Sequence, residues 1–257
     1  MKPLAEIELT SMVYGGEAMG RLSNGKPVFV PFGIDGERVR VEIVEEKPNY
    51  CRGRLLDMLQ ASPRRVTPRC IHYGVCGGCH YQHMGLEDQL ALKKQIVVDQ
   101  FRRIGKFDAP PVLDMLASPE PWNYRNTVQF HLARSGRVGY EKAGSNTFVE
   151  ITECHLPQPM INQVWPELNI DPDSGVERVS LREGAEGDLL LLLEGRSGSA
   201  PEFKVDFPIS AVYSGEGSKT LLSGDGFTVM NVKGRLYKVS AESFFQVNLP
   251  QAERLVD

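Results

Sequence analysis

The segment Cys70-Ile-His-Tyr-Gly-Val-Cys76-Gly-Gly-Cys79 places three cysteines within ten residues, and a fourth, Cys154, follows far along the chain. Thiolates this close repel one another unless a positive centre lies between them, and a chain without a secretory signal favours a metal centre over a disulfide. The two glycines before Cys79 allow a tight turn that directs backbone N–H groups toward sulfur, with φ values that other residues avoid. The alternative is a set of small buried side chains or one chance disulfide.

The spacing alone leaves the kind of metal open. Four cysteine ligands suit either a tetrahedral structural zinc or an iron–sulfur cluster. Zinc modules favour two short Cys-x2–4-Cys pairs, whereas here three candidate ligands cluster and the fourth is distant. This three-plus-one arrangement leans toward a cubane cluster and keeps zinc as the alternative.

Length and composition predict a globular protein without a membrane partner. The 257 residues are enough for two modest domains, and the contents of 41% hydrophobic and 24% charged residues are ordinary. No apolar run reaches the roughly 20 residues that span a bilayer. The N-terminus begins directly with strand-like alternation and has no signal-peptide core, so we expect a cytoplasmic location.

Positive charge concentrates just before the cysteine cluster, although the net charge of −4 argues against a generic nucleic-acid binder. Only one acid, Asp57, interrupts this basic stretch. A local basic stripe can hold phosphate on an acidic protein because charge effects decay within about 8 Å. Scattered arginines on a solvated surface are the alternative. The basic residues are Lys47, Arg52, Arg54, Arg64, Arg65 and Arg69.

The first sixty residues predict a small antiparallel β-barrel of the OB type, over residues 1–62. Asn24-Gly25 and Asp35-Gly36 are strong hairpin signals between short alternating runs. About five closely spaced strands favour a barrel, because closure removes exposed strand edges. Cys51 falls in one of these strands and is interpreted as structural. The clearest runs are residues 7–9, 28–30, 39–43 and 53–55.

A proline-containing linker then leads into a central domain over residues 63–245, which we expect to be β-rich with one helix at 86–104. Gly105 can provide the left-handed stop of that helix. Its predicted apolar face is Leu86, Leu90, Val97, Phe101 and Ile104. The predicted strands are 126–132, 138–140, 189–193, 205–212, 228–232 and 237–239.

The fold class is therefore mainly β, or α+β. Residues 246–257 open a short helix with Pro250 near its first turn. An isolated helix of this length is marginal in water, so we expect this segment to start a further, truncated domain.

Several motifs together resemble a known family. They are Cys70-x5-Cys76-Gly-Gly-Cys79-His-Tyr-Gln82-His83, Tyr124-Arg125-Asn126, Thr152-Glu153-Cys154 and Phe244-Phe245-Gln246-Val247-Asn248. Across essentially the whole chain, the sequence resembles the bacterial 23S rRNA (uracil-5-)-methyltransferases that carry a TRAM domain. Gly16-Glu-Ala-Met-Gly20-Arg and Gly33-Ile-Asp-Gly36-Glu37 are similar to the TRAM domain itself, an RNA-binding, OB-like barrel.

The resemblance implies that Cys70, Cys76, Cys79 and Cys154 hold a [4Fe-4S] cluster. It also implies transfer of a methyl group from S-adenosylmethionine to C5 of a uridine, after a cysteine thiolate attacks C6. The chain departs from the family by ending before the Rossmann-like methyltransferase domain that carries the cofactor loop and the nucleophile. We therefore expect no catalytic residue in this chain, and expect the chain alone to be inactive.

Further residues match the family by motif position. Gln246 corresponds to a residue that contacts S-adenosylmethionine, and Phe244 to an aromatic side chain that approaches the target base. Arg125 is a candidate RNA contact, with a salt bridge that holds its loop as the alternative. The arginines of the basic stretch are expected to bind RNA: Arg52, Arg54, Arg64 and Arg65.

The expected partner is RNA, most directly 23S rRNA, bound by a monomer. Three histidines near the cysteines, His72, His80 and His83, are expected to pack or to support the ligands. One rival interpretation is a stand-alone RNA-binding module with a zinc or iron–sulfur site and no catalysis. Another is a TRAM-bearing radical enzyme of the methylthiotransferase kind, which the five-residue gap between Cys70 and Cys76 argues against.

Overall fold

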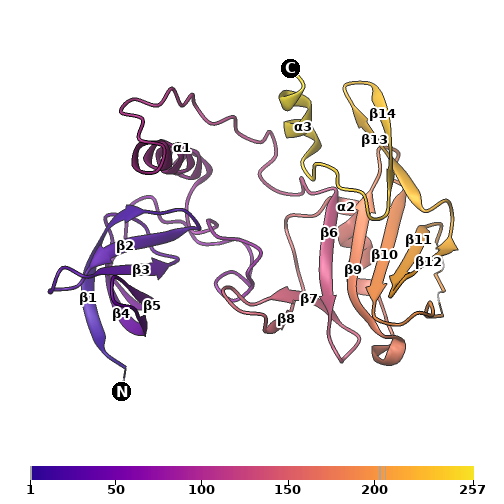
Figure 1. The fold of residues 1–257 in the computed structure, drawn as a ribbon, viewed down its shortest axis with the longest axis horizontal. Coiled ribbons are helices and arrows are strands. Elements are labelled where there is room, and N and C mark those ends of the chain that lie inside the picture. The colour runs from indigo at the N-terminus through magenta and orange to yellow at the C-terminus, as the bar shows by residue number, and fades with distance from the viewer. Residues whose placement is uncertain (1, 203, 206) are drawn as a thin grey trace. The chain divides into compact units, whose positions relative to one another are not determined.

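The computed structural model describes residues 2–202, 204–205 and 207–257, and the chain divides into two compact units (Figure 1). The barrel unit comprises Met1–Gly74 and Cys79–Ala117, and the sheet unit comprises Val75–Gly78 and Ser118–Asp257. The cysteine loop therefore contributes to both units. The predicted limits of 62 and 245 between domains stay predictions.

The barrel unit opens with a closed five-stranded barrel in the order β1-β2-β3-β5-β4, which confirms the predicted barrel. It is not antiparallel throughout as predicted, because β3 and β5 pair in parallel. Its strands alternate buried and exposed positions, as expected for a barrel whose interior is filled by side chains. Cys51 is buried at the start of β5, in agreement with its structural interpretation. The strands are β1 (Leu4–Met12), β2 (Glu17–Arg21), β3 (Pro27–Pro31), β4 (Arg38–Glu46) and β5 (Cys51–Gln60).

Only one of the two predicted hairpins is present. Asn24-Gly25 joins the antiparallel pair β2–β3, and Gly25 has the left-handed φ of 83° that this turn requires. Asp35-Gly36 also turns, with φ 88° at Gly36, but the strands on either side of it both pair with β5. The hairpin prediction at Asp35-Gly36 is wrong because barrel closure inserts β5 between β3 and β4.

A buried carboxylate ties the barrel to the segment that follows it. Glu37 is fully buried and accepts hydrogen bonds from the backbone N–H of Ile34 and Ser62 and from the Arg65 guanidinium. Burial by itself raises the pKa of Glu37, but the hydrogen bonds from Arg65, Ser62 and Ile34 outweigh it, so the net pKa lies below the usual value. The ion pair with Arg65 is therefore structural.

Helix α1 (Leu86–Arg103) confirms the predicted helix but buries a different face. Leu92 and Ile96 pack against Ile34 and Met84, whereas the stripe predicted from Leu86 to Ile104 is largely exposed in the barrel unit. The apolar residues cover more than one face of this helix, so periodicity did not select the face that packs.

The predicted left-handed stop at Gly105 is also wrong, because Lys106 takes that conformation, with φ 59°. Gly105 instead donates its N–H to Gln100 O, and a Cβ there would lie 2.8 Å from Phe101 O. Glycine is needed at this position for a close approach of the backbone.

His83 is buried in the barrel unit beside this helix. Its Nδ1 lies 2.5 Å from the Tyr73 hydroxyl and its Nε2 lies 3.3 Å from Gly33 O. Burial lowers the pKa of His83 to about 4, so the imidazole is neutral in the folded protein. This placement matches the packing role expected for His83.

The sheet unit contains a seven-stranded sheet in the order β12-β11-β10-β9-β6-β7-β8 and a separate hairpin, β13–β14. Neighbours in the large sheet are antiparallel except β10 and β11. The strands are β6 (Thr127–Leu132), β7 (Val138–Glu141), β8 (Phe148–Glu150), β9 (Val176–Glu183), β10 (Leu189–Gly195), β11 (Ser210–Gly215), β12 (Ser218–Ser223), β13 (Phe227–Val232) and β14 (Arg235–Ser240). The helices are α2 (Pro159–Val164), η1 (Trp165–Glu167), η2 (Pro172–Ser174) and α3 (Leu249–Leu255).

The predicted strands at β6, β7, β10, β13 and β14 are confirmed, as is the short helix that begins near Pro250. The strand predicted over residues 205–212 differs, because β11 begins only at Ser210 and residue 206 lies outside the described residues. Strands β8, β9 and β12 were not predicted. Among them β9 matters most, since it lies between β6 and β10 in the sheet.

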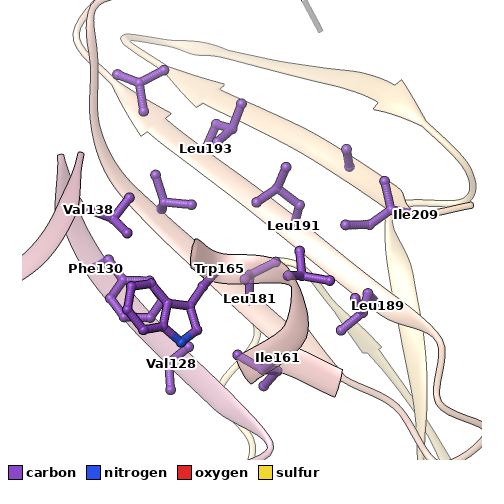
Figure 2. Packing of buried hydrophobic residues seen from close by; sticks show 14 of the residues in the cluster. Val128, Phe130, Val138, Ile161, Trp165, Leu181, Leu189, Leu191, Leu193 and Ile209 are labelled. Atoms are coloured by element: carbon purple, nitrogen blue, oxygen red, sulfur yellow. The ribbon is translucent and has the colours of Figure 1, made fainter. Parts of the chain in front are cut away.

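Strand β10 is apolar on both sides because both faces of the sheet are covered there. Leu189, Leu191 and Leu193 face the main core with Phe130 and Trp165, as Figure 2 shows. Leu190 and Leu192 point to the other face, where they pack with Val212 and Ala241. A continuous apolar run is the expected pattern for a strand buried on both faces. Among the described residues, no helix is long and apolar enough to cross a bilayer.

We expect Glu37→Gln to lower the free energy of unfolding of the barrel unit by about 3 kcal/mol, because it leaves Arg65 without its buried anion. Amide hydrogen exchange of residues 4–60 measures this change. Glu6→Gln is the matched control, since Glu6 pairs with Arg38 and Arg40 at the surface and its loss should cost at most about 1 kcal/mol. Equal effects of the two substitutions would contradict a special role for Glu37.

Acid should destabilise the barrel unit through His83. In the unfolded chain the His83 imidazole is protonated near pH 6.5, whereas in the folded protein its pKa is about 4. The free energy of unfolding therefore falls as the pH drops from about 6.5 to about 4, and it does not depend on this group at higher pH. The full loss is roughly 3 kcal/mol. Urea unfolding followed by circular dichroism between pH 7.5 and 4.5 measures it. His83→Gln should flatten this dependence and the exposed control His80→Gln should not; parallel curves would refute the assignment.

Candidate functional site

Cys76 is held by backbone pairing within the sheet unit. Its loop forms a bridge to Lys142, with Gly77 N–H donating to Glu141 O over 2.9 Å. A Cβ on Gly77 would lie 3.0 Å from that oxygen, so glycine allows the close approach. Gly78 N–H lies 3.4 Å from Cys76 Sγ, which confirms the expected N–H toward sulfur. Neither glycine has a positive φ, so the prediction that Gly77 and Gly78 adopt φ values that other residues avoid is wrong.

Cys154 and Cys76 both pack against the core of the sheet unit and share a neighbour, Tyr140. Burial raises the pKa of Tyr140 well above its usual value, the Cys154 and Cys76 sulfurs raise it further, and Arg125 opposes them. The structure therefore brings Cys76, Cys154, Tyr140 and Arg125 together, from segments that are distant in sequence.

Cys70 and Cys79 belong to the barrel unit. Cys70 N–H donates to Gln82 Oε1 over 3.1 Å, and Cys79 lies close enough to Tyr73 to raise the pKa of its hydroxyl after the larger effect of burial. Within the described part of the chain, no group of three or more histidine, cysteine or acidic side chains is arranged to hold a metal ion. The four-cysteine ligand set stays a prediction.

One observation supports an anionic group near Cys76 and Cys154. The buried Nε of Arg125 has no hydrogen-bond partner among the described residues, and a buried unsatisfied donor is costly. A thiolate-ligated centre held by these two cysteines would supply negative charge near that donor. Soft thiolate ligands also suit zinc or iron–sulfur binding. The side chains present thus fit the predicted group in their chemistry.

The four arginines that were predicted to bind RNA each have an acidic partner from a neighbouring strand or turn. Arg52 pairs with Glu17 and Glu45, and Arg54 with Glu42; the arginine side chains are exposed, whereas Glu17 and Glu42 are partly buried. In the folded chain these arginines therefore have several acidic neighbours, whereas in the linear sequence Asp57 is the one acid among them. The other two are Arg64, which pairs with Asp35, and Arg65, which pairs with Glu37.

Phe244 and Gln246 lie in the segment between β14 and α3. The Phe244 ring is 82% exposed, whereas the next side chain, Phe245, packs near Tyr237 with ring centroids 5.9 Å apart. Gln246 has an exposed side chain and a fixed backbone, because its carbonyl accepts a hydrogen bond from Asn126. These positions leave both predicted contacts accessible within the sheet unit.

Arg125 contacts the neighbouring segments mainly through its backbone. It forms bridges to Pro157 and to Asn248, and its side chain makes no ion pair within the described chain. The alternative of a salt bridge that holds the loop is therefore not supported. Its predicted contact with RNA stays a prediction.

Sequence reasoning missed the residues that hold this segment in place. Asn126 stands in the quoted Tyr-Arg-Asn motif, in which a contact was predicted only for its charged neighbour Arg125. Arg182 lies in β9, which was not predicted as a strand. The sequence signal that could have found the strand is the alternation of Val179 and Leu181, which Arg182 directly follows.

Comparisons with known proteins agree with this architecture. A model of the TRAM domain matches residues 4–56, which confirms that prediction for the barrel. The chain is 32% identical to an uncharacterized RNA methyltransferase of Thermosynechococcus vestitus, over 98% of this chain and 63% of that protein. It is 34% identical to the 23S rRNA (uracil(1939)-C(5))-methyltransferase RlmD of Methylococcus capsulatus, over 71% of this chain and 41% of that protein.

A solved structure has the same fold. The tRNA (uracil-54, C5)-methyltransferase of Pyrococcus abyssi, in complex with S-adenosyl-L-homocysteine, aligns with a TM-score of 0.68 over 97% of this chain and 63% of that chain. At 22% identity this likeness shows the fold alone. The chain thus has relatives among RNA methyltransferases, and it spans less than two thirds of the length of each of these proteins.

Proposed function

We propose that this chain is the RNA-binding and metal-binding portion of an S-adenosylmethionine-dependent 23S rRNA uracil-C5 methyltransferase. The observation that carries the proposal is the similarity to RNA methyltransferases along nearly the whole chain, together with a TRAM barrel at its start. In this proposal, Phe244 faces the target base and Gln246 contacts S-adenosylmethionine. Both are exposed and lie on the same backbone segment.

RNA binding by the barrel is proposed to use Arg52 and Arg54 in particular. Their side chains are 45% and 65% exposed, and exposed ion pairs contribute only about 0–1 kcal/mol, so phosphate can compete for them. Arg64 and Arg65 were predicted as contacts too, but both also bond backbone carbonyls of the barrel, at Asp35 and Phe32. The geometry therefore favours the first two as phosphate contacts.

The proposed ligands of a [4Fe-4S] cluster are Cys70, Cys76, Cys79 and Cys154. When bound, such a centre would supply a cross-link between distant segments, and metal–thiolate binding of about 10–16 kcal/mol in zinc peptides shows the scale of that stabilisation. The proposal rests on the cysteine pattern, on the shared environment of Cys76 and Cys154, and on the unsatisfied Arg125 donor. Zinc is the alternative occupant.

Metal content tests the ligand set. We expect anaerobically prepared protein to contain iron and inorganic sulfide in equal amounts, and Cys76→Ser or Cys154→Ser to lose most of both. Cys51→Ala is the matched control, because Cys51 is the remaining cysteine and lies inside the barrel. Zinc without inorganic sulfide would show that the site holds zinc instead of an iron–sulfur cluster. Protein that contains neither iron nor zinc would contradict the proposed metal site.

Two measurements test the function itself. On the chain, Arg52→Gln with Arg54→Gln should weaken binding to a 23S rRNA fragment and lower the salt slope by about 1 to 2, since each contact contributes about one. The control is Arg178→Gln with Arg196→Gln, a surface pair of arginines in the sheet unit that also have acidic partners. An unchanged slope would move the RNA-binding face elsewhere.

Methyl transfer is measured with the protein as its gene encodes it. After incubation with 23S rRNA, or with tRNA, and S-adenosylmethionine that carries a deuterated methyl group, mass spectrometry of the digested RNA should find labelled 5-methyluridine in the 23S rRNA. Label in tRNA instead would correct the substrate. RNA binding without any label would support a non-catalytic RNA-binding module and overturn the enzymatic proposal.

A further inference from the structure

We infer that Arg182, Thr127 and Asn126 form a directional hydrogen-bond relay that fixes the backbone on both sides of Phe244. This makes them positioning residues for Phe244 and Gln246. The inference rests on the proposed function, because that function assigns these two residues to the RNA base and to S-adenosylmethionine.

Arg182 provides the first anchor. Its side chain leaves β9 and donates from its two terminal nitrogens to Ser240 O over 3.0 Å and to Ser243 O over 2.7 Å. It is 7% exposed and makes no ion pair within the described residues. A buried cation without an anion is costly unless its donors are satisfied, and here backbone carbonyls of the segment that carries Phe244 satisfy them.

The direction of the relay follows from the chemistry of its members. Arginine can only donate, so Thr127 Oγ1 must accept the bond from Arg182 Nε, at 3.1 Å. The single hydroxyl hydrogen of Thr127 then goes to Asn126 Oδ1, at 2.9 Å. That bond fixes the orientation of the Asn126 amide and leaves its Nδ2 to donate to Gln246 O, at 3.0 Å.

Asn126 provides the second anchor. It is fully buried in the sheet unit, and its backbone N–H donates to Val247 O over 3.0 Å while its carbonyl accepts from Glu183 N–H over 2.8 Å. The side chain and the backbone of one residue therefore hold two successive carbonyls of the segment. The β6–β9 pair is the rigid element behind both anchors.

The consequence is an exposed aromatic side chain on a fixed backbone. Phe244 lies between Ser243, whose carbonyl is bound by Arg182, and Gln246, whose carbonyl is bound by Asn126. Phe244 itself lines a cavity of about 350 Å³, together with Thr127, Arg182 and the apolar side chains of β10 among others. Holding the backbone on both sides fixes where this side chain begins. Preorganisation of this kind lowers the entropy that binding would otherwise cost.

Limited proteolysis tests the relay without RNA. Chymotrypsin cleaves after Phe244 or Phe245 only when the segment opens, and the rate then follows the population of the open state. Thr127→Val removes the hydroxyl at nearly constant volume and should speed this cleavage about tenfold, the effect of about 1.4 kcal/mol. Thr127→Ser restores the hydroxyl and should return the rate to within about threefold of wild type. Thr220→Val, at an exposed position of β12, is the control and should change nothing.

Photocrosslinking tests the purpose of the relay. RNA that contains 5-iodouridine should crosslink to the peptide with Phe244, and Thr127→Val should lower that yield about tenfold while changing total RNA affinity less than twofold. Tryptophan fluorescence, to which Trp165 in the core of the sheet unit contributes together with Trp122, checks that each variant is folded.

The two measurements fail in different ways. Unchanged cleavage in Thr127→Val, or faster cleavage that Thr127→Ser does not correct, overturns the relay. Wild-type protein that binds RNA but gives no crosslink at Phe244 overturns the role proposed for that ring, and with it the presentation of Phe244 as the purpose of the relay. Loss of both cleavage protection and crosslinking in Thr127→Val alone supports the inference.

Discussion

A buried polar group must find its hydrogen-bond partners inside the protein, and this constraint organises both units of the chain. In the barrel unit, the buried carboxylate of Glu37 collects donors from the turn before β4, from Ser62 and from Arg65. In the sheet unit, Asn126 and Arg182 bind carbonyls of the segment that follows β14. Each group would be costly alone, so the segments that satisfy it cannot move away without a large loss of stability.

The same constraint separates structural arginines from those available to a ligand. Arg65 and Arg182 are committed to buried or backbone acceptors, and replacing them would disturb the fold. Arg52 and Arg54 are exposed and pair at the surface with the partly buried Glu17 and Glu42, and surface pairs of this kind stabilise little. An acidic chain can therefore still offer phosphate-binding groups, because screening confines each charge to its immediate surroundings. Net charge does not decide whether this protein binds RNA; the placement of individual guanidinium groups does.

Much of the fold was predictable because its signals are local. Alternating residues and Asn24-Gly25 predicted the barrel and its first hairpin, and the spacing of apolar residues predicted helix α1. The wrong predictions concern features that depend on a segment distant in the sequence. The Asp35-Gly36 turn does not form a hairpin because β5 enters between its flanking strands. The apolar face of α1 was misassigned because several faces carry apolar residues and only contact with Ile34 and Met84 selects one.

The candidate site divides in the same way. Residues 70–79 indicate metal-binding chemistry by themselves, since closely spaced thiolates and glycines are informative at any position in a fold. Their surroundings are not encoded locally: Cys76 and Cys154 meet at Tyr140 only because the loop of Cys76 pairs with the end of β7. The sequence alone predicted the barrel, the close spacing of the cysteines and the aromatic motif at Phe244. Only the tertiary structure decided which arginines are buried and how Asn126 and Arg182 hold Phe244, because hydrogen bonds between residues more than fifty positions apart leave no periodic trace in a sequence.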